Sequence, residues 1–254
     1  MSQGAIEFAD AGFSISRDRF LVSGLNLTIQ AGEAMVLLGR SGSGKTTTLK
    51  LINRLLDATQ GEVKVDGIPV ARWDAIKLRR RVGYAIQDVG LFPHYTVFEN
   101  VALVPKIEAW SATKIAARVE QVMSLVGLPM AEFAKRYPHE LSGGQRQRVG
   151  LARALAADPP ILLMDEPFGA LDPITRAEVR SEFQQLQQRL RKTVVFVTHD
   201  IAEALQLGDR IGLMDSGALR GIYRPAEFLA SQDEPARTYA EVFRAGQQIF
   251  RESR

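Results

Sequence analysis

One stretch constrains this chain more than any other: residues 39–47 read Gly-Arg-Ser-Gly-Ser-Gly-Lys-Thr-Thr. They fit a phosphate-binding pattern in which a glycine, four residues and then Gly-Lys-Thr follow one another. The apolar run 34–38 before them predicts a buried strand, and residues 47–52 after them predict the start of a helix. This context suits the pattern, because inward-turned backbone N–H groups then meet the positive end of a helix dipole.

The residue types in this loop assign expected roles. Lys45 is expected to reach the β- and γ-phosphates of a nucleotide, and the Thr46 hydroxyl is expected to ligate Mg²⁺. The other residues are expected to hold the phosphates through their backbone: Gly39, Arg40, Ser41, Gly42, Ser43, Gly44 and Thr47. A Gly/Ser-rich turn that matches by accident is expected in about one chain in a hundred of this length. We therefore interpret the stretch as a nucleotide-binding loop.

Composition excludes several other kinds of protein. The 254 residues are 46% hydrophobic, enough for one large domain or two small ones with a sizeable core. There is no cysteine, which excludes disulfides and thiolate metal sites. The net charge of +3 permits nucleic acid or an anionic membrane as partners but requires neither. The start lacks a signal-peptide pattern and no apolar run could span a bilayer, so we expect a soluble chain that reaches membranes only through partners.

The hydrophobic pattern predicts an α/β core interrupted by helices. Short β-type segments are expected at 6–8, 13–15, 25–29 and 61–65, and further strands at 82–86, 161–164, 193–198 and 211–214. Residues 88–158 are mostly helical in pattern, with one helix after the N-cap Ser111 and another over about 143–157. A further helix is expected between the strands 161–164 and 193–198. Its core face should be formed by Val179, Phe183, Leu186 and Leu190. Residues 222–254 predict a polar helical tail.

Two acidic residues directly follow one of the predicted buried strands. Asp165 and Glu166 come after the apolar run 161–164, and such strands end at the ligand edge of an open α/β sheet. Asp165 is expected to hold Mg²⁺, directly or through water. Glu166 is then placed to activate a water for attack on the γ-phosphate. The alternative is a solvated acidic turn, which the nearby phosphate-binding loop disfavours.

A second anion site is predicted at residues 141–145, Leu-Ser-Gly-Gly-Gln, which open the second insertion helix. Ser142 is a good N-cap, and the two glycines leave backbone N–H groups exposed at the helix N-terminus. The alternative is an ordinary capped helix after a glycine turn. A second nucleotide would need its own phosphate-binding lysine and its own set of acids at a strand end, and the sequence shows neither. We therefore expect this site to complete the nucleotide pocket of another copy.

Two uncharged polar residues follow other predicted strands. His199 follows the strand 193–198 and could reach the γ-phosphate or the attacking water. Gln87 follows the strand 82–86, where its amide could sense Mg²⁺ or water without changing the charge balance. Either residue alone would be unremarkable, since a lone histidine is usually structural or solvated.

Together these motifs resemble the ATP-binding cassette (ABC) ATPases over nearly the whole chain. The resemblance identifies Gly39–Thr47 as the Walker A loop, Gln87 as the Q-loop residue and Leu141–Gln145 as the signature. It identifies Ile161–Asp165 as Walker B, followed by the catalytic Glu166, and Ala170–Asp172 as the D-loop, with His199 as the switch histidine. It implies catalytic roles for Glu166, His199 and Gln87, and a magnesium site of Thr46, Gln87 and Asp165. ATP and Mg²⁺ are the implied cofactors.

The resemblance also implies a fold and an assembly. The implied fold is a P-loop NTPase (RecA-like) core over 1–87 and 159–221, with an N-terminal antiparallel β-subdomain. A helical signature subdomain is inserted over 88–158, and a helical tail follows over 222–254. In the family two copies sandwich two ATP molecules head to tail. Ser142, Gly143, Gly144, Gln145 and Asp172 would then face the nucleotide of the partner copy. One departure stands out, since the usual adenine-stacking aromatic falls at Ile15, where Phe13 or Phe20 could substitute.

The kind of ABC protein follows from what the chain lacks. It has no fused membrane helices, no long coiled coil and no second cassette. A stand-alone ATPase subunit that docks on separate permease subunits is therefore expected, as a peripheral protein at the cytoplasmic face of a bacterial inner membrane. Residues 90–105 and 165–176 are similar to importers of quaternary-ammonium osmoprotectants such as glycine betaine, choline and carnitine. A substrate-binding protein would be an indirect partner, and no nucleic acid is expected.

Two alternatives stay open at this point. The chain could serve an importer of another small molecule, or it could be a soluble ABC ATPase that acts on nucleic acid or ribosomes. The osmoprotectant cassettes often carry a C-terminal pair of CBS modules, and the sequence ends at Arg254. Such regulation is therefore expected to be absent or to reside elsewhere.

The stretch 89–95 predicts the docking surface for the permease. It is rich in apolar and aromatic side chains, and Gly90 and Pro93 exclude a regular element. An exposed apolar patch of this kind marks an interaction site. Phe92 and Tyr95 are the expected anchors, unless they fold back into the core of the inserted helices.

Overall fold

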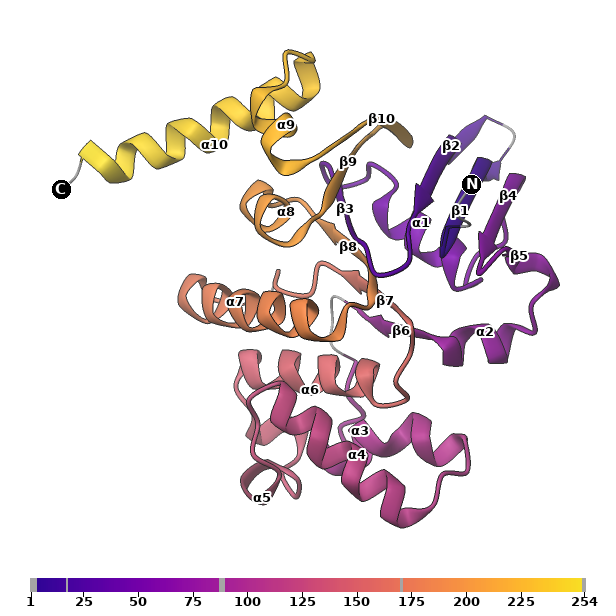
Figure 1. The fold of residues 1–254 in the computed structure, drawn as a ribbon, viewed down its shortest axis with the longest axis vertical. Helices are drawn as coiled ribbons and strands as arrows, with labels where there is room; N and C mark the ends of the chain where they lie inside the picture. Colours follow the sequence, from indigo (N-terminus) through magenta and orange to yellow (C-terminus); the bar gives the residue numbers. More distant parts are fainter. Residues whose placement is uncertain (1–3, 17, 87–89, 170, 253–254) are drawn as a thin grey trace. The chain divides into compact units, whose positions relative to one another are not determined.

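The computed structural model describes residues 4–16, 18–86, 90–169 and 171–252, with side chains through Ala245 (Figure 1). Its contacts divide the chain into two compact units. The first unit comprises residues 1–75 and 193–254, and the second comprises residues 76–192. Each unit is described by itself below.

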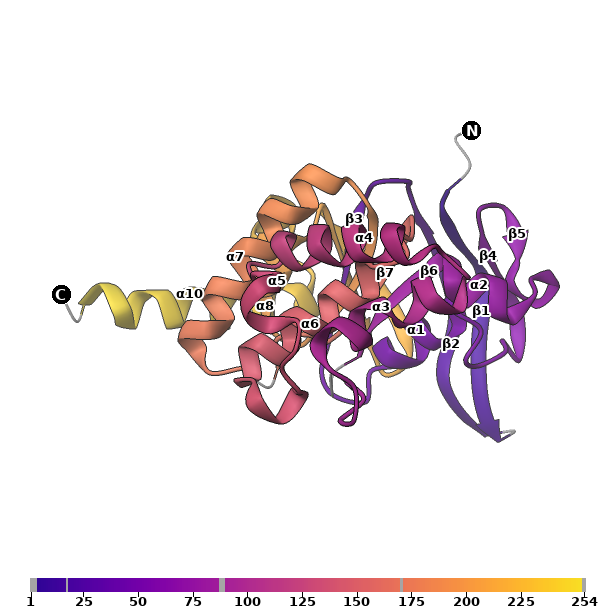
Figure 2. The same ribbon diagram turned by 90° about the horizontal axis from the view of Figure 1, so that it is seen from below.

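An antiparallel sheet forms the N-terminal part of the first unit, in the order β2-β1-β4-β5 (Figure 2). Its strands are β1 (Ile6–Ser16), β2 (Arg19–Ile29), β4 (Gln60–Val65) and β5 (Ile68–Pro69). The expectation of separate short segments at 6–8 and 13–15 was wrong, because β1 runs through both. Its register shifts between Phe8 and Ala11, next to Asp10 at φ 48°. Such a bulge changes the apolar alternation without ending the ladder.

The other strands of the first unit follow the order β10-β9-β3-β8. They are β3 (Ala34–Leu38), β8 (Thr193–Thr198), β9 (Arg210–Asp215) and β10 (Ala218–Tyr223). β3 lies parallel to β8 and β9, whereas β10 pairs with β9 in the antiparallel sense. Every residue of β3 is buried, as its continuous apolar run predicted.

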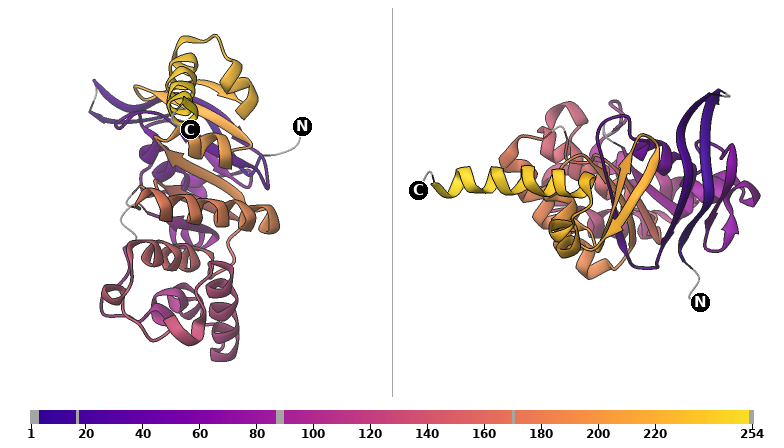
Figure 3. Two further views of the ribbon diagram at one scale, coloured as in Figure 1. Left: turned by 90° about the vertical axis from the view of Figure 1, so that its left-hand side faces the viewer. Right: turned by 90° about the horizontal axis from the view of Figure 1, so that it is seen from above.

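The helices of the first unit surround these strands. They are α1 (Lys45–Ile52), η1 (Val70–Arg72), α8 (Ile201–Leu207), α9 (Pro225–Ala230) and α10 (Glu234–Glu252). α1 contacts β2, β4 and β8 and buries Leu49, Leu51 and Ile52. The expected tail from residue 222 needs correction, since Ile222 and Tyr223 pair with β9 before α9 and α10 begin. The C-terminal helix α10 is the yellow helix that ends at C in Figure 3. Alternating apolar residues in β10 carry the sheet beyond the predicted boundary.

The second unit combines two parallel strands with helices. The strands are β6 (Val82–Ala85) and β7 (Ile161–Asp165). The helices are α2 (Ala75–Arg81), α3 (Val97–Ile107), α4 (Ala112–Leu125), α5 (Met130–Phe133), η2 (Pro138–Glu140), α6 (Gly143–Leu155) and α7 (Pro173–Leu190). α3 and α4 both contact α6. The predicted α/β class, with N-terminal antiparallel strands and inserted helices, is confirmed.

Local capping explains where these helices begin. Ser111 accepts a hydrogen bond from the backbone N–H of Lys114 at 3.3 Å, as its N-cap prediction required. The predicted core face of α7 is confirmed at Val179, Phe183 and Leu186. Leu190 is only half-buried, because α7 ends there at Arg191, whose φ is 46°. Within the described residues no helix is long and apolar enough to cross a membrane.

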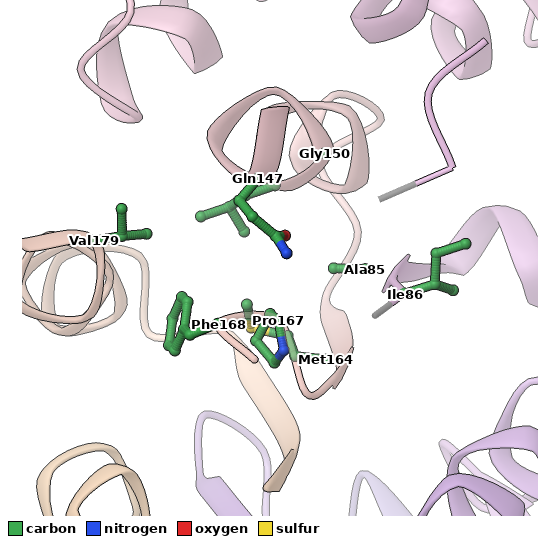
Figure 4. Close-up of a pocket in the computed structure, with 9 residues that line it drawn as sticks. Ala85, Ile86, Gln147, Gly150, Met164, Pro167, Phe168 and Val179 are labelled. Carbon is green, nitrogen blue, oxygen red and sulfur yellow. The ribbon is translucent and has the colours of Figure 1, made fainter. Parts of the chain in front are cut away.

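A small cavity in the second unit is lined by the side chain of a buried glutamine (Figure 4). Its volume is about 10 Å³, which is at the lower limit for one water molecule. Its lining includes Gln147 of α6, Met164 of β7 and Phe168. Gln147 is 8% exposed, and its Nε2 has no partner among the described residues. A buried polar group left unpaired costs about 1–3 kcal/mol.

Replacement of this amide should therefore stabilise the chain. We expect Gln147→Met to raise the free energy of unfolding by about 1 kcal/mol, because the unpaired amine is removed and the side-chain volume is kept. Urea denaturation followed by circular dichroism measures the change. Gln188→Met, on an exposed position of α7, is the matched control and should be neutral. A lower stability of Gln147→Met would mean that the amide has a buried water as its partner.

Candidate nucleotide site

The loop between β3 and α1 ends at a helix N-terminus that no side chain caps. Gly44 is the N-cap of α1, with φ 98°, and no side chain caps the first turn. A helix N-terminus without a side-chain cap is a place where backbone N–H groups can bind an anion. A Cβ atom on Gly44 would lie 2.5 Å from the carbonyl oxygen of Leu21, in addition to the strain of its positive φ. Only glycine fits this position.

Lys45 occupies the centre of the loop. Its side chain is buried, with 4% exposure, and its Nζ donates to the carbonyl oxygens of Gly39 at 2.8 Å and Arg40 at 2.9 Å. The Oγ of Ser43 lies 3.5 Å from the same ammonium. A buried charge is tolerated only when it is hydrogen-bonded in this way. The loop therefore holds a positive charge beside the N-terminus of α1.

The remaining loop residues divide by exposure. Gly39 and Ser43 are buried, Thr46 and Thr47 are half-buried, and the outer part of the loop is exposed, comprising Arg40, Ser41 and Gly42. The loop is anchored from the other side, since Gly217 N–H donates to the Ser43 carbonyl at 3.2 Å. The anchored inner side and the open outer side leave room for a ligand to approach from solvent.

His199 lies at the same sheet edge as this loop. Leu38 and Thr198 are paired in the parallel strands β3 and β8, so Gly39 and His199 follow neighbouring positions. The turn is fixed by the Thr198 hydroxyl, which donates to the Glu203 carboxylate at 2.5 Å and accepts from the N–H of Asp200 at 2.9 Å. His199 itself is exposed.

The adenine-stacking candidates lie on the hairpin of β1 and β2. Ile15 is 61% exposed and Phe20 is 47% exposed, whereas Phe13 is half-buried. Phe20 pairs with Ser14 in the ladder, next to Ile15. Two of the three candidates thus present apolar surface to solvent, and the platform stays a prediction.

The acidic pair of the second unit has one strained and one buried member. Asp165 ends β7 with 6% exposure, and its Oδ2 accepts a hydrogen bond from the Tyr84 hydroxyl at 3.2 Å. Burial, followed by the charge of Asp165, raises the pKa of Tyr84 well above its usual range. Glu166 has φ 44°, a conformation that costs a non-glycine residue about 1–3 kcal/mol. Such strain is typical of functional sites.

Sequence reasoning missed Tyr84. Its place became visible only from the parallel pairing of Tyr84 with Leu163, because Leu163 and Asp165 face the same side of β7. A single tyrosine in a short strand otherwise indicates packing. The proximity of Tyr84 to Asp165 identifies it as a residue of the site.

The signature residues form a capping box at the start of α6. The Ser142 Oγ accepts from the N–H of Gln145 at 3.2 Å, and the Gln145 Oε1 accepts from the N–H of Ser142 at 2.9 Å. The N-cap prediction for Ser142 is confirmed. The box uses the side chain of Gln145, so the N–H groups of Gly143 and Gly144 are the donors left for an anion.

The D-loop ends in a second capped helix. The Asp172 Oδ1 accepts from the N–H groups of Ile174 and Thr175, both at 3.1 Å. Hydrogen bonds from Thr175 and then Ile174 hold the pKa of Asp172 below its usual value. Asp172 is exposed and ionised at neutral pH, where it favours the positive end of α7.

The predicted site residues therefore gather in three places. The first unit joins the phosphate-binding loop with His199. The second unit joins Asp165 with Glu166, and separately joins the signature with the D-loop. Gln87 and Ala170 lie outside the described residues. The part of the chain that the structure describes contains no group of three His, Cys, Asp or Glu residues arranged to hold a metal.

This loop and the strands around it define a nucleotide-binding protein of the phosphate-loop class. The ABC transporter family model matches residues 22–169, the greater part of the chain. The chain therefore belongs to the ABC transporter family. The resemblance inferred from the sequence motifs is confirmed, as is the predicted fold class.

Comparison with individual proteins gives the following similarities. The chain is 48% identical over 222 residues to the glycine betaine/carnitine/choline transport ATP-binding protein OpuCA of Bacillus subtilis, covering 87% of this chain and 57% of that protein. It is 49% identical over 222 residues to the glycine betaine uptake system ATP-binding protein YehX of Escherichia coli, covering 87% and 71%. The chain thus spans less than two thirds of the first relative's length.

A solved structure agrees with the fold. A dimeric ATP-binding cassette in a post-hydrolysis state, bound to ADP and Pi, matches with a TM-score of 0.77 and 34% identity. The match covers 87% of this chain and 98% of that one.

The buried ammonium of Lys45 predicts a selective loss of nucleotide affinity. Lys45→Met keeps most of the side-chain volume but removes the charge and the donors. We expect it to weaken ATP binding by about a hundredfold, the scale of a lost charge-assisted bond or two. Titration with a fluorescent ATP analogue measures this. Lys50→Met, in the last turn of the same helix α1, is the control and should bind as the unchanged chain does.

Proposed function

We propose that the chain is the ATP-hydrolysing, energy-coupling subunit of an ABC importer for osmoprotectants such as glycine betaine and choline. The observation that carries the ATPase part is the loop that surrounds the buried Lys45 ammonium with carbonyl oxygens. The names of the relatives support the importer part, since both denote transport or uptake of glycine betaine. They favour this class over a soluble ABC ATPase that acts on nucleic acid or ribosomes.

In this proposal each predicted site residue has one role. Loop residues 39–47 bind the phosphates, and Glu166 acts as the general base toward water. His199 and Gln87 contact the γ-phosphate region. Mg²⁺, when bound, neutralises charge on the phosphate oxygens. A hydroxyl from Thr46 and a carboxylate from Asp165 are hard oxygen donors that suit this ion, which keeps few protein ligands beside phosphates.

Two copies would work together in a head-to-tail dimer. Residues 88–158 would form the signature subdomain of each copy, between core segments 1–87 and 159–223, with the helical tail beginning after β10. Ser142, Gly143, Gly144, Gln145 and Asp172 would face the nucleotide held by the partner copy. The free N–H groups of Gly143 and Gly144 support this role, because a helix N-terminus attracts phosphate. The dimeric state of the solved cassette also supports it.

The permease would dock on the segment 90–95 at the cytoplasmic face of the membrane. Asn100 is fully buried and orders this segment: it accepts from the N–H of Phe92 at 2.8 Å and donates to the carbonyls of Phe92, Tyr95 and Thr96 at 3.0–3.1 Å. The order leaves Phe92 40% exposed, with its ring 5.4 Å from that of Tyr95. This exposure supports an interaction surface over a place in the core.

A pocket beside Phe92 would receive the partner. Its volume is about 350 Å³, and its lining includes Gly90, Phe92, Leu103 and Arg153. The Arg153 guanidinium donates to the Gly90 carbonyl at 2.7 Å, which ties the segment to α6. A short permease helix with an apolar side chain over the pocket would fit this surface. A substrate-binding protein would deliver the transported solute to the permease.

Glu166→Gln should abolish hydrolysis and keep ATP binding. Glutamine has the same shape but cannot accept the proton of the attacking water, and loss of a general base costs about 10²–10⁴-fold in rate. Phosphate release from ATP by the purified chain measures the rate, and gel filtration with ATP should show a stable dimer. Hydrolysis at an undiminished rate would remove Glu166 from the role of base.

The same variant tests the importer assignment. In the source organism, uptake of radiolabelled glycine betaine should depend on this gene and should fail when Glu166→Gln replaces the unchanged copy. Uptake of an unrelated sugar is the control and should not change. Normal glycine betaine and choline uptake without the gene would redirect the assignment to another solute.

Docking on the segment 90–95 predicts that transport and hydrolysis can be separated. Phe92→Ala with Tyr95→Ala should weaken permease binding by about tenfold or more, since aromatic anchors dominate interfaces. Basal ATPase of the isolated chain should survive. Copurification of permease subunits from detergent-solubilised membranes measures the binding. Ile107→Ala, a 54% exposed apolar residue at the end of α3, is the control. Equal loss of transport and soluble ATPase would favour a structural role for the two rings.

A further inference from the structure

The starts of α6 and α7 are in unusually close contact. A Cβ atom on Gly144 would lie 2.4 Å from the Cγ2 methyl of Thr175, a separation that real side-chain atoms do not reach. A Cβ atom on Gly143 would lie 3.9 Å from the Cδ2 methyl of Leu171. The signature turn thus packs against Thr175 at Gly144, and Leu171 lies near it at Gly143. α6 and α7 also contact each other.

The D-loop side of this contact is firmly held. The Arg176 Nη2 donates to the Leu171 carbonyl at 2.9 Å and more weakly to that of Gly169 at 3.4 Å. Leu171 is buried, with 4% exposure. Asp172 is tied to Thr175 through the N–H of that residue at 3.1 Å. The residues that flank Asp172 therefore have little freedom relative to α7.

Thr175 takes part both in the contact with Gly144 and in the hydrogen bond to Asp172. Its backbone N–H binds the Asp172 carboxylate, and its methyl group fills the space above Gly144. No role in nucleotide contact was expected for it, and its side chain is half-buried. Packed cores transmit displacement because they do not deform continuously. A shift of Asp172 would therefore displace the signature turn, and the reverse.

We propose that Thr175 is a positioning residue that locks the signature turn and the D-loop into one body, so that Gly144 and Asp172 reach the nucleotide of a second copy in a single geometry. This inference rests on the proposed head-to-tail ATPase. The two groups lie on different helices, and a nucleotide that meets both benefits only if their separation is set beforehand. The Thr175 methyl sets it, and the absence of a Cβ on Gly144 makes room for that methyl.

The first experiment introduces a steric clash between Gly144 and Thr175 and then removes it with a second substitution. In the Glu166→Gln chain, Gly144→Ala should weaken ATP-driven dimerisation by about tenfold or more, because the added Cβ collides with the Thr175 methyl. ATP affinity of the monomer should not change. Addition of Thr175→Ser, which removes only that methyl, should restore dimerisation to within about threefold of Thr175→Ser alone. Analytical ultracentrifugation at increasing ATP concentration measures the midpoint.

A packing control separates positioning from simple destabilisation. A Cβ atom on Gly83, which lies in the same unit, would lie 2.4 Å from the Ala154 carbonyl oxygen. Gly83→Ala thus introduces a clash at the C-terminal end of α6, opposite the signature turn. It should lower the melting temperature without lowering dimerisation at temperatures where the chain is folded. Equal loss of dimerisation in Gly83→Ala and Gly144→Ala would overturn the inference.

The second experiment needs no variant with a steric clash. Ser142→Ala and Asp172→Asn are combined in a double-mutant cycle, with the ATP midpoint of dimerisation as the readout. In the chain with Thr175 the two changes should be coupled by about fivefold or more, as for residues in one network. In the Thr175→Ser chain the coupling should fall to about onefold, which is additivity. A purely structural threonine would shift all midpoints together and leave the coupling intact.

The outcomes distinguish this inference from the proposed function. Failure of Thr175→Ser to rescue a folded Gly144→Ala chain would overturn it, since the Cβ would then clash with nucleotide instead. If Gly144→Ala fails to fold, the double-mutant cycle still tests the inference. Unchanged coupling between Ser142→Ala and Asp172→Asn in the Thr175→Ser chain would overturn it. If the Glu166→Gln chain forms no ATP-dependent dimer at all, the head-to-tail proposal fails, and this inference with it.

Discussion

The buried ammonium of Lys45 is the interaction on which the nucleotide site depends. Its bonds to the carbonyls of Gly39 and Arg40 hold those two oxygens against the ammonium, next to the N-terminus of α1. A charge at 4% exposure cannot stay ionised without such partners. The loop conformation and the lysine thus require each other, and β3, whose residues are all buried, provides the rigid base.

The same logic places the other functional side chains. Helix caps hold Ser142 and Asp172 at the starts of α6 and α7, and strand ends hold Asp165 and His199. Each cap satisfies backbone groups that would otherwise be orphaned. A polar residue at an element boundary therefore has a structural reason to stay in place and a free surface with which to bind.

Buried polar groups also give shape to the segments that would meet other proteins. Asn100 uses both ends of its amide to order the segment 90–95, which keeps the aromatic rings together at the surface. Arg176 orders the D-loop in a similar way through backbone carbonyls. Loops held by hydrogen bonds to their backbone can expose apolar side chains without collapse into the core. This combination suits surfaces that bind a permease or a second copy.

The sequence by itself determined the phosphate-binding loop, the buried strand before it, the caps of α4 and α6, and the acids after β7. Those features depend on residues within one turn or one strand, so spacing is sufficient to predict them. Only the tertiary structure decided that β1 continues past Asp10, that Tyr84 donates to Asp165, and that the Thr175 methyl fills the space above Gly144. These depend on register between strands and on the approach of helices distant in sequence. Spacing along the chain carries no information about either, because both are settled by packing.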